Sequence, residues 1–235
     1  MNPPDRSSLA LQTIALLEGL AQPRLVALAR QCRWHSVDAH HALLRRSDPQ
    51  HEVYFLLSGR VRVTSYSAGG RQVSFRDVAP GDYFGDLSAI DGQPRSADVV
   101  TLEPSVVASL GGADFIALLR EEPLVAERAL RNLVALVRQT SERVIELSTL
   151  GVNNRLHAEL LRRARAAGVD AQHRARLDPA PQHEALASQI STGREQVTRE
   201  LNALVRGGLL AKDGKALVIL DVERLARLVA EVHGP

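Results

Sequence analysis

Cysteine is nearly absent from this chain of 235 residues, in which Cys32 is the only one. A single thiol cannot close a disulfide within the chain, and it cannot by itself hold an iron–sulfur cluster, which needs several thiolates. The sequence also lacks an apolar run long enough to span a bilayer, and its first nine residues show no secretory pattern. Together these features predict a protein of the reducing cytoplasm with no membrane partner.

Aromatic residues are scarce as well, so Leu, Val and Ala carry most of the apolar content. The hydrophobic fraction of 45% is ordinary for a globular protein and is enough for a sizeable core. The length is natural for two small domains. The net charge of +2 does not by itself indicate a nucleic-acid partner.

One group of basic residues is nevertheless concentrated in the last third of the chain, with few acids between its members. The group consists of Arg155, Arg162, Arg163, Arg165, Arg174 and Arg176. These arginines form either a solvated helix face or a surface that approaches phosphates.

Short apolar or alternating runs recur between Trp34 and Leu110, and glycine-containing turns separate them. The runs are 53–57, 61–64, 73–75, 99–100 and 106–108, and the turns include Gly59, Gly69-Gly70, Pro80-Gly81 and Gly111-Gly112. Short strands at this close spacing predict a β-sandwich or barrel. Residues 8–33, before the first strand, have helical spacing, and Pro23 suits a helix start.

A long helix is predicted after Pro123, because its apolar residues follow a near-heptad pattern. The main stripe is Leu130, Val134, Val137, Ser141, Val144 and Ser148. A single β-domain cannot cover so long a stripe, so a two-stranded parallel coiled coil is the expected solution. The alternative is a helix that packs only against its own domain. Gly151 marks the expected hinge into the last segment.

Helices alternate with a short hairpin from Asn153 onward. We expect helices at 154–167, 184–190 and 194–206. Apolar runs at 209–212 and 216–220 flank Asp213-Gly214, which is a strong hairpin signal, and Asp221 can cap a final helix. A helix, a turn, a second helix and a β-wing form a winged helix-turn-helix.

The second helix of this motif carries polar residues that can read bases. With Val197, Leu201 and Leu204 turned inward, its exposed residues near the N-terminus are Arg194, Glu195, Thr198 and Arg199. Arginine can donate a bidentate pair to guanine, and glutamate can accept a hydrogen bond from cytosine. Because this end of a recognition helix enters the major groove, the pattern predicts binding to double-stranded DNA.

The run from Gly193 to Arg199 resembles the Ser/Thr/Gly-Arg-Glu-x-Val-x-Arg motif of the cyclic AMP receptor protein (catabolite activator)/fumarate-nitrate regulator family. The resemblance implies that Arg194, Glu195 and Arg199 read a TGTGA-like half-site. It also places His183 near a residue that contacts phosphate in the family. Ser191 departs from the pattern, because the family often has glycine in this turn.

A second constellation extends from Gly81 to Ala97. Gly85 allows a sharp turn, and a short helix from Asp86 to Ile90 can then aim free N–H groups at an anion. Arg95 can pair with a phosphate, Ser96 can donate one more hydrogen bond, and an acceptor-only Asp86 suits a ribose hydroxyl. The alternative is an Arg95–Asp86 ion pair that holds an empty barrel together.

This stretch resembles the phosphate-binding cassette of cyclic-nucleotide-binding domains. The resemblance implies that the ribose and the cyclic phosphate are held by Gly85, Asp86, Ser88, Arg95 and Ser96. Relatives often have glutamate where this chain has Asp86, so the shorter side chain weakens the ribose contact or changes the ligand preference. Cyclic AMP is the favoured allosteric effector and cyclic GMP the competitor.

The segment Thr140-Ser141-Glu142-Arg143-Val144 is similar to the helix segment that contacts adenine in the same family. By that resemblance Thr140 contacts the base within its own subunit and Ser141 reaches the nucleotide of the partner subunit. The alternative is that two small polar residues relieve crowding in the seam of the coiled coil. A pair of hydroxyls can serve either purine edge, which leaves the choice between the two nucleotides open.

The sequence is not expected to encode an enzyme or a metal site. Adjacent histidines on a strand, as we place His40 and His41, point to opposite faces and rarely share an ion. No catalytic constellation stands out by spacing.

The predicted fold is therefore α+β: a cyclic-nucleotide-binding β-roll (residues 1–122), a dimerisation helix and hinge (123–151), and a winged helix-turn-helix (152–235). The resemblance implies a homodimer that contacts RNA polymerase. Two alternatives are a regulator of the same fold that senses another ligand or none, and a cyclic-nucleotide module that acts by protein contact.

Overall fold

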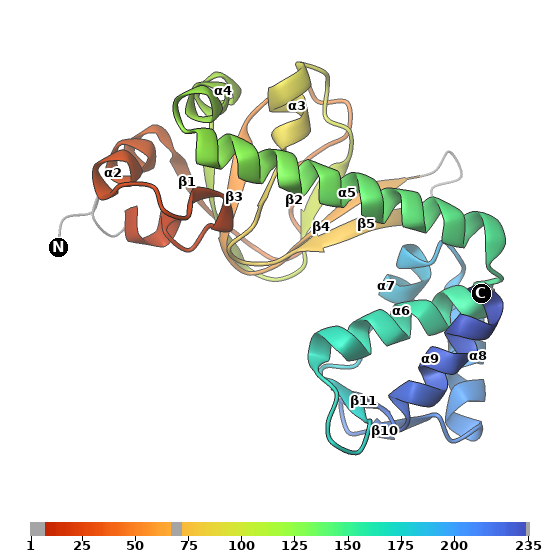
Figure 1. Cartoon of the computed structure of the whole chain (residues 1–235). Helices are drawn as coiled ribbons and strands as arrows, with labels where there is room; N and C mark the ends of the chain where they lie inside the picture. Colours follow the sequence, from red (N-terminus) through yellow and green to blue (C-terminus); the bar gives the residue numbers. More distant parts are fainter. Residues whose placement is uncertain (1–7, 67–71, 234–235) are drawn as a thin grey trace. The chain divides into compact units, whose positions relative to one another are not determined.

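The protein is described by a computed structural model that covers residues 8–66 and 72–233 (Figure 1). The chain divides into two compact units, Met1–Leu136 and Val137–Pro235, and the boundary falls inside the long helix α5 (Pro123–Thr149). Among the described residues, no helix combines the length and apolarity needed to cross a membrane. The first unit is a β-roll, and the second is mainly helical.

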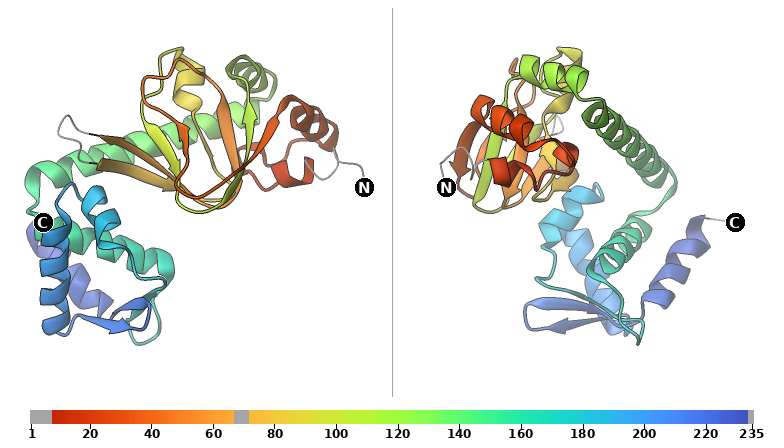
Figure 2. Two further views of the ribbon diagram at one scale, coloured as in Figure 1. Left: turned by 180° about the vertical axis from the view of Figure 1, so that it is seen from behind. Right: turned by 60° about the vertical axis from the view of Figure 1, so that its left-hand side comes forward.

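Two four-stranded antiparallel sheets form the roll, and Figure 2 shows them from behind. One sheet has the order β1 (Arg33–Val37), β8 (Ser105–Leu110), β3 (Val53–Ser58), β6 (Tyr83–Phe84). The other has the order β2 (Ala42–Leu44), β7 (Asp98–Thr101), β4 (Val61–Tyr66), β5 (Gln72–Val78). The expected β-fold is confirmed, although β1, β2 and β6 were not predicted, and the Gly69-Gly70 turn lies outside the described residues.

Strand β3 is buried on both faces, which explains its nearly continuous apolar sequence. Val53 and Phe55 pack with residues of the flanking helices, whereas Leu56 packs with Val61, Val99 and Val107 between the sheets. The flanking helices are η1 (Ala15–Leu17), α2 (Gln22–Gln31) and α4 (Gly112–Glu121), and the short α3 (Asp86–Asp91) follows β6.

Helical segments lie within residues 8–31, as the spacing of residues 8–33 predicts, and Arg33 already belongs to β1. The segment forms separate helical pieces, and Gly19 interrupts them with a positive φ of 76°. Helix α2 has Pro23 in its first turn, as predicted. His40 and His41 lie in the turn between β1 and β2, so the prediction that they lie on a strand is wrong.

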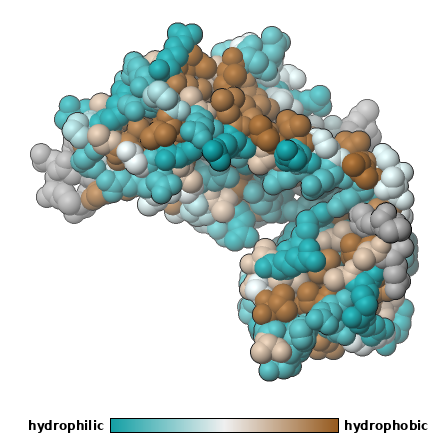
Figure 3. Space-filling model, in the orientation of Figure 1, coloured by the Kyte–Doolittle hydropathy of each residue, from teal (hydrophilic) through white to brown (hydrophobic). Residues whose placement is uncertain are grey.

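Helix α5 exposes the predicted apolar stripe. Leu130, Val134, Val137 and Val144 have more than half of their surface accessible, between 54% and 64%. Exposed apolar residues are expected singly on a protein surface, but four in heptad register on one helix are not. Figure 3 shows apolar patches among hydrophilic residues on the face that carries this helix.

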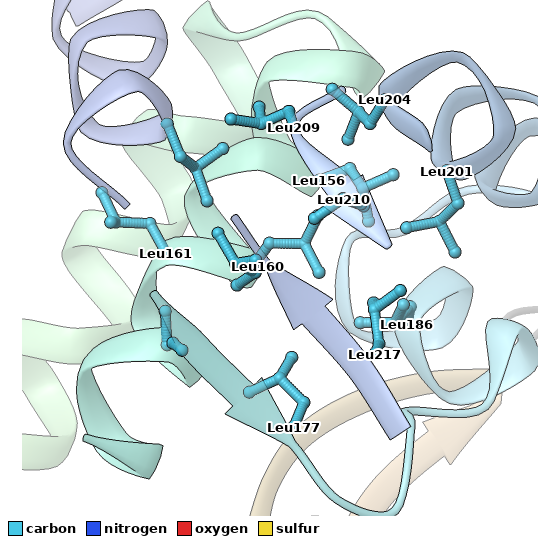
Figure 4. Close-up of a cluster of buried hydrophobic side chains, with 14 of the residues drawn as sticks. Leu156, Leu160, Leu161, Leu177, Leu186, Leu201, Leu204, Leu209, Leu210 and Leu217 are labelled. Carbon is cyan, nitrogen blue, oxygen red and sulfur yellow. The ribbon is translucent and has the colours of Figure 1, made fainter. Parts of the chain in front are cut away.

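The second unit has the element order of a winged helix-turn-helix. It contains α6 (Val152–Ala167), β9 (Ala175–Leu177), α7 (His183–Gln189), α8 (Arg194–Arg206), β10 (Leu210–Asp213), β11 (Ala216–Ile219) and α9 (Val222–His233). The three strands form one sheet in the order β10-β11-β9. Leucines from α6, α7, α8 and the hairpin point toward one another in its core (Figure 4).

The hairpin and the last helix follow the sequence signals with one correction. The tight turn consists of Gly214 and Lys215, one residue later than the expected Asp213-Gly214, and Gly214 has a φ of 59°. Asp213 instead pairs with Ala216 at the end of the strands. Asp221 caps α9 as predicted, because its Oδ1 accepts the backbone N–H of Arg224 at 2.8 Å.

Candidate functional site

Gly85 directly follows β6 and serves as the N-cap of α3 with a φ of 87°. A side chain here would be strained by the backbone conformation, and its Cβ would lie 2.8 Å from the carbonyl oxygen of Glu52 and 3.0 Å from Nη1 of Arg95. The glycine is therefore required by both the turn and the close approach of Arg95.

Arg95 lies in the loop after α3 with only 4% of its surface exposed. Its Nη1 donates to the carbonyl oxygen of Gly85 at 2.8 Å and to Oγ of Ser88 at 2.6 Å. Its Nη2 donates to the carbonyl oxygen of Glu52 at 2.8 Å and lies 3.6 Å from Oε2 of the same residue. Burial lowers the pKa of the guanidinium from its usual value, and Glu52 opposes this effect.

The alternative of an Arg95–Asp86 ion pair is wrong, because the carboxylate paired with Arg95 is that of Glu52. Glu52 was not predicted from the sequence, and no signal in its neighbourhood could have identified it. Asp86 is itself buried, at 6% exposure. Burial raises its pKa, while its own backbone N–H and that of Leu87 favour the charged form.

The cassette residues meet at one place in the roll. Gly85 and Ser88 contact Arg95 directly, Asp86 occupies the first position of α3, and Ser96 follows Arg95 with its surface exposed. An open pocket of about 510 Å³ lies next to them between α3 and α4. Glu52 and Ser88 border both this pocket and Arg95.

Thr140 and Ser141 lie on α5 beyond Leu136, so they do not belong to the unit that holds the cassette. Both are exposed, and the hydroxyl of Ser141 donates to the backbone carbonyl of Val137 at 3.0 Å. Within the first unit, Asn132 of α5 contacts β6, the strand before Gly85. Its Nδ2 donates to the Tyr83 hydroxyl at 3.0 Å.

The predicted DNA-reading residues occupy the start of α8. Arg194, Glu195 and Arg199 are exposed, whereas the inner-face residues Val197 and Leu201 are buried as predicted. Ser191, in the turn between α7 and α8, has a φ of 55°. This left-handed conformation explains why glycine suits the position in the family.

His183 begins α7 and contacts α8 through its ring. Its Nδ1 lies 2.7 Å from Oγ1 of Thr198, so these two predicted DNA-contacting residues lie side by side. Burial lowers the pKa of His183, and the nearby cations Arg194 and Lys212 lower it further. Burial and these two cations thus favour the neutral form of the imidazole in the free protein.

Most of the clustered arginines are paired with other groups of the second unit. Arg162 and Arg163 pair with Glu159, Arg174 pairs with Asp170, and Arg176 pairs with Asp213. Arg155 donates to the carbonyl oxygens of Leu150 and Ile190. The described residues contain no group of three or more His, Cys, Asp or Glu side chains placed to hold a metal ion.

A β-roll with a nucleotide cassette, joined by a long helix to a winged helix-turn-helix, defines a DNA-binding transcription regulator with a sensor domain. Two family profiles match these parts: "Cyclic nucleotide-binding domain" over residues 34–122 and "Crp-like helix-turn-helix domain" over residues 154–228. The chain belongs to the CRP/FNR family of transcription regulators.

Individual relatives agree with this assignment. The Cyclic AMP receptor protein of Thermus thermophilus is 34% identical over 67% of this chain and 70% of its own. The CRP-like cAMP-activated global transcriptional regulator of Mycobacterium tuberculosis is 25% identical over 92% of this chain and 97% of its own. The solved structure of FixK2 from Bradyrhizobium japonicum shares the fold, with a TM-score of 0.70 at 19% identity over 85% of this chain and 98% of that one.

Proposed function

We propose that this chain is a homodimeric regulator whose DNA binding is controlled by a cyclic purine nucleotide, cyclic AMP in preference to cyclic GMP. One observation carries the nucleotide part of the proposal. A guanidinium has five N–H donors, and the bonds of Arg95 to Gly85, Ser88 and Glu52 use three of them. The remaining two are on Nε and Nη2, and the buried Nε has no partner among the described residues.

Two donors on adjacent nitrogens suit the two oxygens of a cyclic phosphate, and a bidentate pair would satisfy the orphan Nε. In the proposed complex Gly85 admits the ligand next to the backbone, Ser96 donates to the phosphate, and Asp86 accepts from the ribose. Ser88 contributes by holding Arg95. Thr140 contacts the base within its subunit, and Ser141 reaches the nucleotide of the partner.

A different effector is the second candidate, and Asp86 is the observation that favours it. Its carboxylate is buried and is approached by the N–H groups of Asp86 and Leu87, which leaves it less free to bind a ribose than an exposed side chain would be. In this case Arg95 would still bind an anion, but a purine nucleotide would not be its ligand.

The dimer part of the proposal rests on the exposed stripe of α5. Leu130, Val134, Val137 and Val144 are in heptad register and lie on the surface, as the seam of a two-stranded coiled coil requires. Pairing two such helices would bring Ser141 of each to the seam. Nucleotide binding at this helix would then shift the equilibrium between arrangements of the two DNA-binding units.

The DNA part rests on the first turn of α8. Arg194, Glu195 and Arg199 are exposed at the helix end that a helix-turn-helix inserts into the major groove. We propose that they read inverted TGTGA-like half-sites, that His183, held by Thr198, contacts the DNA backbone next to them, and that the bound regulator then contacts RNA polymerase.

The test begins with selection of duplexes from a random-sequence pool, with and without saturating cyclic AMP, at fixed salt. We expect enrichment of inverted TGTGA-like half-sites and a clear increase in affinity with the nucleotide. Arg95→Ala should remove the calorimetric signal of cyclic AMP, while Arg60→Ala, at an exposed arginine of the same unit, should leave it unchanged.

Arg194→Ala combined with Arg199→Ala should abolish specific DNA binding and retain nucleotide affinity. An affinity for the selected duplex that is unchanged by either nucleotide would refute the allosteric control. No heat with cyclic AMP or cyclic GMP would favour the different effector, and specific DNA binding by the double variant would refute the base contacts.

A further inference from the structure

The hydroxyl of Thr198 has two polar neighbours but only one hydrogen. It lies 3.0 Å from the carbonyl oxygen of Arg194 and 2.7 Å from Nδ1 of His183. The carbonyl can only accept, so the arrangement that satisfies both contacts has Thr198 donating to Arg194 and His183 donating to Thr198. We assign the hydrogen of the neutral ring to Nδ1 on this basis. The other ring nitrogen, Nε2, then carries a lone pair.

The charges around the ring oppose its protonation in the free protein. Arg194 approaches from α8 and Lys212 from β10, and both are cationic. On α7 itself the adjacent residue is Glu184, which is exposed, and no ion pair joins His183 to an acid among the residues that the structure describes. The lowered pKa of His183 follows from its burial and from these two cations.

We propose that DNA binding by this protein takes up one proton at Nε2 of His183 in each subunit. The inference rests on the proposed function, in which His183 faces a backbone phosphate. A neutral ring with its hydrogen on Nδ1 presents a lone pair to a phosphate oxygen, which repels it. A protonated ring presents an N–H and a positive charge, which the phosphate attracts. The reaction is therefore protein plus DNA plus one proton per subunit.

The direction of the pH dependence follows from this balance. The phosphate compensates the positive field of Arg194 and Lys212, so the pKa of His183 rises when the complex forms. Because the complex binds more protons than the free protein, affinity is greater at low pH and is lost as the pH rises through the pKa of the complex. The DNA affinity falls by up to about tenfold per pH unit for each subunit that is bound to DNA.

The experiment measures affinity for the selected duplex by fluorescence anisotropy between about pH 6 and pH 8, the range in which histidine titrates. Ionic strength and nucleotide concentration are held constant. His183→Gln keeps an N–H donor that cannot titrate, so its affinity should lose the steep dependence on pH. The matched control is His173→Gln, which removes an exposed histidine of the same unit that is paired with Glu223. The control should keep the wild-type slope.

A second measurement does not depend on any variant. Calorimetry of wild-type DNA binding in phosphate and in Tris, which differ in heat of ionisation, counts the protons taken up. We expect uptake approaching one proton per subunit at neutral pH. Equal heats in the two buffers, or the same pH slope in the wild type and in His183→Gln, would overturn the proton uptake while leaving the proposed function intact. Failure to select any duplex would overturn both.

Discussion

The side chain of Arg155 donates hydrogen bonds to the ends of two helices. Removing these bonds tests how much they stabilise the second unit. Its Nη1 donates to the carbonyl oxygen of Leu150, which follows the end of α5, at 2.8 Å. Its Nε donates to the carbonyl oxygen of Ile190, the C-cap of α7, at 3.0 Å. Carbonyl groups at helix ends have no partner within the helix, so these two bonds satisfy groups that would otherwise depend on water.

The expected cost of Arg155→Met can be worked out from these bonds. A hydrogen bond from a charged donor contributes about 1.5–3 kcal/mol, which for two bonds sets an upper range of about 3–6 kcal/mol. Arg155 is only half-buried, so water recovers part of this, and methionine keeps the packing of the aliphatic stem. We expect a loss of about 2 kcal/mol, or a Tm lower by about 8–16 °C for a unit of this size.

The protein offers a simple assay for this unit. Trp34 is the only tryptophan, and all tyrosines and phenylalanines precede residue 137, so intrinsic fluorescence reports the first unit alone. Far-UV circular dichroism follows the helices of both units. Arg155→Met should move the dichroism transition in urea and leave the fluorescence transition in place, while Arg155→Lys should recover part of the loss.

The control is Arg165→Met, at an exposed arginine of the same helix, which should change the unfolding free energy by less than about 0.5 kcal/mol. A loss below this limit for Arg155→Met, or an equal loss for Arg165→Met, would show that the bonds to the helix ends do not stabilise the unit.

Three further changes test other contacts. Ser191→Gly removes the strain of a left-handed backbone conformation and should raise the unfolding free energy of the second unit, measured in urea, by about 0.5–1 kcal/mol. Ser191→Val should lower this free energy, and the opposite order of the two variants would refute the strain. Glu52→Gln removes a negative charge 3.6 Å from Arg95 and should raise nucleotide affinity about threefold to tenfold by calorimetry, while a lower affinity would mean that Glu52 supports the ligand. Burial, with a smaller effect of Asp114, raises the pKa of the Cys32 thiol to about 12. Iodoacetamide at about pH 8.5 should therefore label Cys32 only after unfolding. Fast labelling of the folded protein would contradict the burial of this thiol.

Local sequence signals predicted those parts of this protein whose structure depends on residues close together in the sequence. The periodicity of Val197, Leu201 and Leu204 predicted α8, whose bounds, Arg194–Arg206, are those expected. The carboxylate of Asp221 predicted the start of α9, and the apolar repeat after Pro123 predicted α5. These signals suffice because a helix face, a cap and a tight turn are each formed within a few residues of the chain.

The tertiary structure decided which side chains are partners. Glu52 precedes Arg95 by 43 residues, and only the pairing of β3 with its neighbours and the turn at Gly85 bring them together. The same holds for His183 with Thr198 and for Arg155 with Ile190, pairs that join different helices. The sequence showed that the arginines are clustered but not which acidic residues pair with them, because contacts between distant residues depend on how the elements pack.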